Sequence, residues 1–332
     1  MSVSTSQWEN CSSILEENVP CSETTEVKAV DVALFMFACL LSSFVCTGNL
    51  LAILSIWRTP SLRTLPNLYV ASLAAADFVV GLGTVVLALF LLPAVRVELF
   101  YRYINLCVLM HGTHLGMIAV SVLHMTLISI DRFLYINRPY VYERVVTVRL
   151  VLVCLTGIWV FGLFYSLVPQ FTYKPYGVRP ICDITMRLPI EYLFFTSASL
   201  YFSLASIIIL MYSLILRTAF RQQNAVGANH VTQVQGENQA SRKSTLKGVK
   251  FFMIVFGVFF VCLTPVVVCL GFDYYSYVPG PIYRFLNLVA LTNSGMNFVI
   301  LAILNKQFRR ALFKILCPCG GSRKSFGSSS PL

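Results

Sequence analysis

Charged residues are scarce in this chain of 332 residues: lysine, arginine, aspartate and glutamate make up 12% of it, against 57% for hydrophobic residues. A soluble globular domain carries about 25% charged residues, roughly twice this share. The mean hydropathy is +0.75. This shortage of charge excludes an ordinary soluble domain and indicates a chain that lies mostly within a lipid bilayer.

Patterns typical of enzymes and of secondary transporters are also missing. The chain has no nucleophile–base set, no glycine-rich phosphate loop and no metal-ligand spacing, so we expect no catalytic residue. Transporters of this size often contain internal repeats with paired broken helices, and no repeat is visible here. A multi-pass transporter or channel is therefore kept as the alternative to the interpretation below.

The N-terminus lacks a basic start followed by an apolar run, so no cleavable signal peptide is expected. The first 31 residues are instead polar and acidic, with Glu9, Glu16 and Glu23 among them. The first spanning helix would then serve as the targeting signal.

Seven runs of mostly apolar residues are long enough to cross a bilayer. The hydrocarbon core is about 30 Å thick, so a spanning helix needs about 20 such residues. Backbone polar groups in lipid must be paired within their own segment, which excludes open sheet. The sequence therefore predicts an all-α membrane protein with a bundle of seven transmembrane helices. The predicted spans are Val32–Trp57, Leu68–Leu92, Leu106–Tyr135, Leu150–Val168, Tyr192–Leu216, Val249–Phe272 and Ile282–Leu304.

Basic residues predict the orientation of the bundle. Of the 25 lysines and arginines, 18 lie in the tail after the last span or in the connections that follow odd-numbered spans. Basic connections stay in the cytoplasm, so we expect an extracellular N-terminal tail (1–31), a seven-helix transmembrane domain (32–304) and a cytoplasmic amphipathic helix with tail (305–332). The net charge of +11 follows from this topology, and a nucleic-acid partner is not needed to explain it. The expected location is the plasma membrane.

Three covalent modifications are expected from this topology. Asn10 begins an N-glycosylation sequon in the outer tail. Cys107, at the outer end of the third span, and Cys182, in the next outer loop, both face an oxidising space where a disulfide bond persists. Cys317 and Cys319 follow the amphipathic stretch Lys306–Leu316, where palmitoylation is expected and two free thiols are the alternative.

A polar residue inside a spanning helix is costly and is a functional hypothesis by default. Asp77 is the one acid deep in the second span. An oxygen-rich set around a buried carboxylate suits a small hard cation such as sodium, and a hydrogen-bonded network that only packs helices fits equally well. Five polar residues lie at a similar depth on other spans, namely Asn49, Ser121, Asn293, Ser294 and Asn297.

Several short motifs occur in a fixed order along the chain. They are Gly48-Asn49, Leu73-Ala74-Ala75-Ala76-Asp77, Cys107, Asp131-Arg132-Phe133, Pro139, Tyr142, Trp159, Pro169 and Tyr212. In this order and spacing the chain resembles rhodopsin-like (class A) G-protein-coupled receptors, from about Val32 to Leu316.

The resemblance implies a mechanism. In such receptors the arginine of the Asp-Arg-aromatic triplet helps form the cavity that receives the G-protein tail, and Arg132 would do so here beside Asp131. Phe133, Pro139, Tyr140 and Tyr212 complete the expected coupling surface. The implied partners are a heterotrimeric G protein, arrestin, membrane lipids and an extracellular ligand.

The chain departs from the family pattern at positions that move during activation. Leu263 stands where tryptophan is usual, Phe298 replaces proline, and Leu301 replaces tyrosine. Thr245 stands where many members have an acid that pairs with the arginine. The missing acid predicts measurable basal signalling.

The expected ligand cavity is mostly apolar. His114 stands where amine receptors have an aspartate, and Leu291 stands where opsins have the retinal lysine, so a classical amine and covalent retinal are disfavoured. His111 and His114 share a helix face and could bind a ligand, respond to pH or simply be hydrogen-bonded. A moderately hydrophobic small molecule or lipid-like ligand is expected. The predicted lining is His111, His114, Ile118, Thr196, Leu200, Val266, Leu270, Tyr283 and Asn287.

Overall fold

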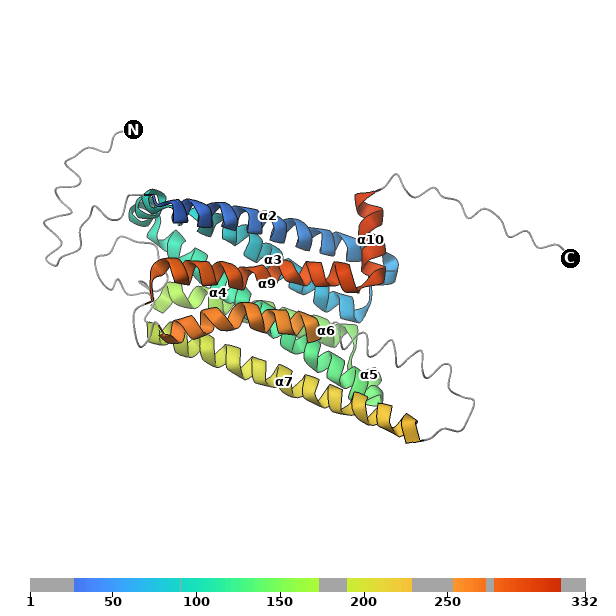
Figure 1. The fold of residues 1–332 in the computed structure, drawn as a ribbon. Helices are drawn as coiled ribbons and strands as arrows, with labels where there is room; N and C mark the ends of the chain where they lie inside the picture. The colour runs from blue at the N-terminus through green and yellow to red at the C-terminus, as the bar shows by residue number, and fades with distance from the viewer. Residues whose placement is uncertain (1–26, 90, 173–189, 229–252, 273–277, 318–332) are drawn as a thin grey trace, which may run out of the picture.

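The computed structural model describes residues 27–89, 91–172, 190–228, 253–272 and 278–317. Within them, seven helices are long and apolar enough to cross a membrane, and they run side by side as one bundle (Figure 1). The predicted seven-helix membrane bundle is confirmed. The spanning helices are α2 (Ala29–Arg58), α3 (Leu65–Leu89), α4 (Pro93–Asn137), α6 (Val148–Thr172), α7 (Ile190–Ala228), the helix Met253–Phe272 and α9 (Gly280–Leu304).

Short elements follow three of the spans at one end of the bundle. The turn η2 (Pro60–Leu62) follows α2, α5 (Pro139–Val145) follows α4, and α10 (Lys306–Leu316) follows α9. The amphipathic helix predicted at Lys306–Leu316 is therefore present, and it lies across the end of the bundle (Figure 1). We call this end of the molecule the α10 end, and the opposite end, where α2 begins, the Ala29 end.

Proline marks several helix starts. Pro60, Pro93, Pro139 and Pro281 each lie in the first turn of their helix. Proline has no N–H to donate and its fixed φ suits a first turn, whose N–H groups have no partner within the helix. At α10 the Asn305 side chain accepts from the N–H groups of Gln307 and Phe308, which closes the turn between α9 and α10.

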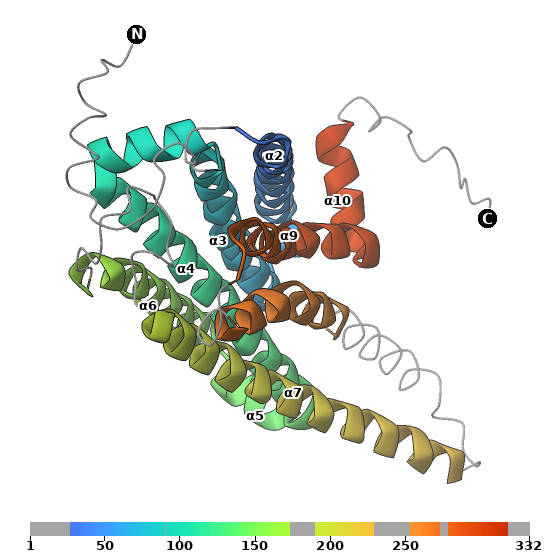
Figure 2. The same ribbon diagram turned by 60° about the vertical axis from the view of Figure 1, so that its left-hand side comes forward.

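Helix α4 occupies the centre of the bundle. It contacts α3, α6 and α7, and its portion Val108–Asn137 is the most buried of the seven spans. Figure 2 shows that the turns before this portion run at an angle to the rest of the helix. Figures 1 and 2 also show the last turns of α7 extending past the neighbouring helices at the α10 end.

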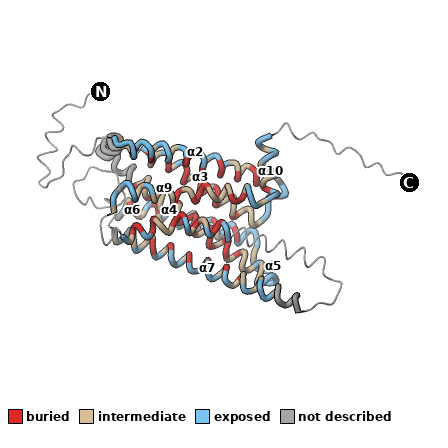
Figure 3. The backbone as a smooth tube through the Cα atoms, in the orientation of Figure 1, coloured by how far each residue is buried: buried red, intermediate tan, exposed pale blue. Residues whose placement is uncertain are grey.

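Large apolar side chains cover the outward faces of the bundle. On α6, Leu152, Val153, Val160 and Phe164 are all exposed, and Figure 3 shows exposed residues along the outer helix faces with buried residues between the helices. So continuous an apolar surface would be unfavourable in water. It is the surface that a lipid bilayer covers, as expected for a multi-pass membrane protein.

Glycine allows α4 and α6 to approach until their backbones touch. A Cβ atom on Gly116 would lie 2.6 Å from the carbonyl oxygen of Gly162 and would overlap the Ser166 side chain. A Cβ on Gly162 would overlap Val120 in turn. Small residues are favoured at contacts between membrane helices for this reason.

A hydrogen-bonded set of three side chains ties α3, α4 and α6 together. Trp159 Nε1 donates to Ser72 Oγ at 3.0 Å, and His124 Nε2 lies 2.8 Å from the same hydroxyl. His124 Nδ1 lies 2.8 Å from the carbonyl oxygen of Val120. A carbonyl only accepts, so Nδ1 carries the proton and the Ser72 hydroxyl donates to Nε2. Every polar atom of this set therefore has a partner.

Candidate ligand cavity and coupling surface

A cavity of about 200 Å³ lies between the helices toward the Ala29 end. Eight of the nine predicted lining residues surround it: His111, His114, Ile118, Leu200, Val266, Leu270, Tyr283 and Asn287. They come from α4, α7, the helix Met253–Phe272 and α9. The sequence analysis thus selected residues from four helices that surround one cavity in the structure. Their role in binding stays a prediction.

Thr196 is the ninth predicted residue, and the structure places it beside the cavity. Its hydroxyl accepts from Tyr165 Oη at 3.4 Å, and Tyr165 itself lines the cavity. The next residue, Ser197, also lines it. Thr196 thus contacts a residue that lines the cavity without being among the lining residues itself.

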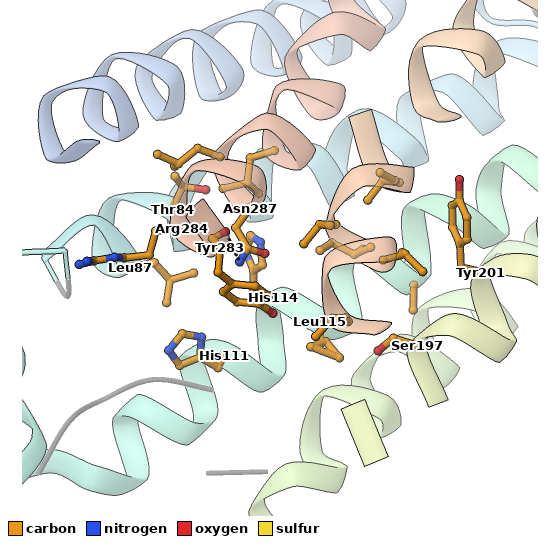
Figure 4. A pocket seen from close by; sticks show the side chains of 18 of the residues that line it. Thr84, Leu87, His111, His114, Leu115, Ser197, Tyr201, Tyr283, Arg284 and Asn287 are labelled. Atoms are coloured by element: carbon orange, nitrogen blue, oxygen red, sulfur yellow. Dashed lines mark hydrogen bonds between the residues drawn. The ribbon is translucent and has the colours of Figure 1, made fainter. Parts of the chain in front are cut away.

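Most of the cavity wall is aliphatic, and its polar groups are concentrated. Figure 4 shows His111, His114, Arg284 and Asn287 toward one side, with Tyr201 and Ser197 on the other. Tyr201 is held by a 2.7 Å hydrogen bond to Thr264, and the Asn287 amide donates to the carbonyl oxygen of Tyr283 at 3.1 Å. The Nδ1 atom of His114 is buried without a hydrogen-bond partner. The wall thus offers a large apolar surface with a few polar groups, as small-molecule sites usually do.

Arg284 is a cavity residue that the sequence prediction missed. It lines the cavity from α9, and its Nη1 atom lies 3.2 Å from Asp31 Oδ1 in the first turn of α2. Asp31 is 4% exposed, and its other oxygen accepts from the Lys28 backbone N–H at 3.2 Å. The signal was present, because an ionisable residue among the apolar residues of a span is a functional hypothesis by default.

The floor of the cavity separates it from the polar residues around Asp77. Ile118, Leu263 and Leu291 line both this cavity and a much smaller one that Ser121, Asn293 and Ser294 also line. Leu263 is the residue that replaces the usual tryptophan, and here it is 4% exposed. An aliphatic floor therefore stands between the two candidate sites.

Asp77 is fully buried and accepts hydrogen bonds from two helices. Ser121 Oγ on α4 donates to Oδ1 at 3.3 Å, and Asn297 Nδ2 on α9 donates to Oδ2 at 2.8 Å. Asn49 Nδ2 donates to the Ser294 carbonyl oxygen at 3.0 Å. The side-chain oxygens of Asn293 and Asn297 are buried without a hydrogen-bond partner. All six predicted residues thus lie in the same region, and it contains oxygens that still lack a donor.

The coupling residues lie at the α10 end of α4. Arg132 is bonded to the carboxylate of Asp131, and its guanidinium carbon lies 5.2 Å from the centre of the Tyr135 ring. Tyr69 Oη on α3 donates to the other oxygen of Asp131 at 3.2 Å. These contacts hold the side chain of Arg132 against its own helix.

The remaining coupling candidates divide into exposed and buried positions. Pro139 begins α5, and Tyr140 follows it with 89% of its surface exposed. Phe133 and Tyr212 lie instead in or against the main hydrophobic core, where the Tyr212 ring packs on Phe256 at a centroid distance of 5.8 Å. A protein that approaches this end would therefore meet Tyr140 first.

Tyr142 on α5 completes this surface. Its ring packs edge-on against Tyr135 at 5.2 Å. Burial raises the pKa of its hydroxyl above the ordinary value, and the negative charge of Asp131 raises it further. Tyr142 therefore stays neutral at physiological pH.

Several predicted modification sites lie outside the described residues. They are Asn10, Cys182, Cys319 and the side chain of Cys107, and Thr245 also lies outside the described residues. Cys317 is described, and its exposed free thiol follows α10 directly. The Cys107–Cys182 disulfide stays a prediction, and mass spectrometry of non-reduced peptides would detect it as a linked pair.

Metal-ligating side chains are not clustered in the part of the chain that the structure describes. It contains no group of three or more His, Cys, Asp or Glu residues placed to hold a metal ion. Among the described residues, no third His, Cys, Asp or Glu side chain joins His111 and His114 to form such a group. A transition-metal site at these histidines therefore has no support from the described residues.

Known proteins resemble this chain over nearly its whole length. The model of the family described as "7 transmembrane receptor (rhodopsin family)" matches residues 48–300. "G-protein coupled receptor 3" of Rattus norvegicus is 28% identical over 320 residues, which cover 95% of this chain and 91% of that protein. "G-protein coupled receptor 6" of Homo sapiens is 27% identical, with 88% and 77% covered. "Cannabinoid receptor type 1B" of Takifugu rubripes is 23% identical, with 96% and 70% covered.

Proposed function

Because this chain belongs to the rhodopsin family of seven-transmembrane receptors, we propose that it passes an extracellular ligand signal to a heterotrimeric G protein. The ligand binds in the cavity at the Ala29 end, and the G protein binds at the α10 end around Arg132. The N-terminus faces outward, as the distribution of basic residues indicates.

The observation that carries this proposal is the placement of both sites on α4. His114 lines the cavity, and Arg132 lies 18 residues further along the same helix. At 1.5 Å per residue these positions are about 27 Å apart, close to the thickness of a hydrocarbon core. One buried helix therefore reaches from a ligand site on one side of the membrane to a partner site on the other.

Replacing Arg132 with alanine tests the proposal. We expect ligand-free nucleotide exchange on added G proteins to fall at least about tenfold, which corresponds to roughly 1.4 kcal/mol. Exchange would be measured in membranes at equal surface expression, with the major G-protein classes in parallel. The exposed Arg149, which begins α6 near the same end, provides the Arg149→Ala control. Wild-type exchange above that of mock membranes, retained in full by Arg132→Ala with every class, would refute the coupling role.

We also propose that the Asp77 region holds a sodium ion. The residues present fit this cation, because Asp77 is a fully buried carboxylate and the oxygens of Asn293 and Asn297 lack a hydrogen-bond donor. A bound cation would supply positive charge beside Asp77 and would hold α3, α4 and α9 together. Ser121 and Asn297 would keep Asp77 oriented toward it.

Sodium binding would appear as salt-dependent stability. Replacing choline with sodium at constant ionic strength should raise the melting temperature of the purified wild type, because a ligand that binds only the folded state stabilises it. Asp77→Asn should abolish the shift. A shift that the variant retains would assign the effect to another site, and no shift in wild type would leave the polar residues as a packing network alone.

The cytoplasmic end is completed by a lipid anchor in this proposal. The amphipathic α10 lies across the bundle end, and the exposed Cys317 follows its last residue. A palmitoyl chain on Cys317 would therefore enter the adjacent bilayer. Arrestin would compete with the G protein for the same end. Acyl-biotin exchange on wild type and Cys317→Ser tests the modification, which is refuted if both proteins label equally.

A further inference from the structure

We propose that the ligand is a single-chain amphiphile with an acidic head, a carboxylate or a phosphate, which pairs with Arg284. This inference rests on the proposed receptor function and adds the chemical class of the ligand. It starts from the one charged side chain among the described residues that line the cavity.

Arg284 fixes the sign of the charge. Arg284 lines the cavity, whereas Asp31, its partner at 3.2 Å, is almost wholly buried and does not line the cavity. A ligand with a positive head would therefore meet Arg284 first and be repelled. An anionic head with two or three oxygens suits the planar fork of a guanidinium, which binds carboxylate or phosphate through paired hydrogen bonds.

Asp31 is placed so that Arg284 can change partners. Breaking a buried ion pair is costly when it leaves a charge without compensation. Here the second oxygen of Asp31 keeps its hydrogen bond from the Lys28 backbone N–H, at the positive end of the α2 dipole. Asp31 thus remains stabilised when Arg284 pairs with a ligand. The carboxylate of Asp31 and the acidic head of the ligand therefore compete for the Arg284 guanidinium.

The other cavity residues offer polar contacts for the head of the ligand and apolar contacts for its chain. Asn287 lies one turn after Arg284 on α9, and His111 lies on α4 toward the same side of the cavity (Figure 4). These groups can contact head oxygens. The wall also includes Leu263, Val266 and Leu270, which offer only apolar contacts to a chain, with Tyr201 and Ser197 on the side opposite His111 (Figure 4).

The cavity size limits the body of the ligand. Drug-sized sites measure about 300–1,000 Å³, and this cavity holds about 200 Å³. That volume favours one short acyl or alkyl chain over a two-chain phospholipid.

Four probes with the same decyl chain test the proposal: decanoic acid, decyl phosphate, decanol and decylamine. Equilibrium binding is measured with the purified receptor in nanodiscs of neutral lipid, with empty nanodiscs subtracted. Wild type should bind at least one acidic probe about tenfold more tightly than decanol, and decylamine least of all. The two acidic arms distinguish a carboxylate from a phosphate ligand. Equal binding of all four probes, a preference for decylamine or no binding would overturn the proposal.

Two substitutions with opposite expected effects separate ligand contact from a structural role. Arg284→Gln should lower affinity for the acidic probe about tenfold, and Arg284→Lys should retain part of it. Asp31→Asn should raise that affinity by about threefold or more, because it removes the competing acid. If the pair only held α2 to α9, Asp31→Asn would weaken binding as Arg284→Gln does. A misfolded variant cannot mimic tighter binding.

The control and the readout keep this proposal distinct from receptor function. Arg310→Gln removes an exposed arginine at the α10 end and should leave probe affinity unchanged. The binding assay contains no G protein. A chain that binds the acidic probes but drives no nucleotide exchange would refute the proposed function alone, whereas exchange without head-selective binding would refute this inference alone.

Discussion

Ser72 is the single hydroxyl through which α3, α4 and α6 share a hydrogen-bonded set. It accepts from Trp159 and donates to His124. Ser72→Ala would leave two buried ring nitrogens without a partner, and each unsatisfied group costs about 1–3 kcal/mol. We expect a lower melting temperature for the purified receptor, measured by thermal unfolding in detergent.

The matched substitution Ser72→Thr keeps the hydroxyl and should lose much less stability than Ser72→Ala. Ser206→Ala is a further control, because that hydroxyl is exposed and bonds only within its own helix. If Ser72→Ala melts with the wild type, the three-helix set contributes nothing to stability.

Single positions also show where sequence reasoning failed. Thr196 and Leu200 were both expected to line the cavity on α7; Leu200 does so, whereas Ser197 lines it in place of Thr196. Each residue turns an α-helix by about 100°, so an error of one position moves a side chain to another face. Hydropathy alone cannot fix that rotation on α7, because lipid and the cavity both accept apolar side chains.

Arg284 was missed for a different reason. It lies near the start of the predicted span Ile282–Leu304, where a basic residue fits the topology and carries no information about contacts. Its importance depends on Asp31, which lies 253 positions earlier in the chain. No local pattern relates the two residues, so only the packing of α2 against α9 reveals the pair.

At the scale of whole elements, the α4–α6 contact depends on glycine. Gly116→Ala places a methyl group against the backbone of Gly162, so one helix must shift, and such overpacking costs about 1–3 kcal/mol. We expect lower surface expression and a lower melting temperature.

Gly157→Ala is the matched control on α6, because a Cβ there meets nothing within 4 Å. It should be neutral or slightly stabilising, since alanine has the higher helix propensity. Similar losses from both substitutions would show that the close contact between α4 and α6 does not explain the effect.

Hydropathy predicted the number of spanning helices better than it predicted where each helix begins. The third span was predicted from Leu106, whereas α4 begins at Pro93. Arg96, Glu98 and Arg102 interrupt the apolar run without interrupting the backbone hydrogen bonds, because charged residues are good helix formers. Apolar length therefore predicts what lies in lipid, and proline predicts where the helix starts.

For the molecule as a whole, the proposed coupling role makes the balance between inactive and active states a property of Arg132 and its partners. Thr245 replaces a family acid, and it lies outside the described residues. We expect Thr245→Glu to lower ligand-free nucleotide exchange at equal surface expression. A restored, partly exposed ion pair is worth on the order of 1 kcal/mol, which changes a two-state ratio about fivefold.

Thr245→Gln is the control for that substitution, because it adds similar bulk without charge. It should leave ligand-free exchange near the wild-type level. A wild type with no exchange above mock membranes, or a Thr245→Glu variant equal to Thr245→Gln, would show that the missing acid does not set the balance.

The seven-helix architecture was predictable because the bilayer imposes it. A hydrocarbon layer requires long apolar helices, and the chain contains seven such runs. How these helices pack could not be read from hydropathy, because most of their faces are apolar. The family resemblance supplied the residues expected to line one cavity, and eight of those nine residues surround it in the structure.

The length of α7 has a mechanical consequence. With 39 residues, it measures about 58 Å, so with Phe194 near one membrane boundary the turns toward Ala228 continue about 20 Å past a hydrocarbon core of about 30 Å. We expect this part to follow any tilt of α7 as a rigid extension of the helix. A tilt of about 10° there displaces its tip by about 3 Å, since a rigid helix of that length carries the whole rotation outward. A spin label near Ala228 would therefore report rearrangements that are too small to resolve within the bundle.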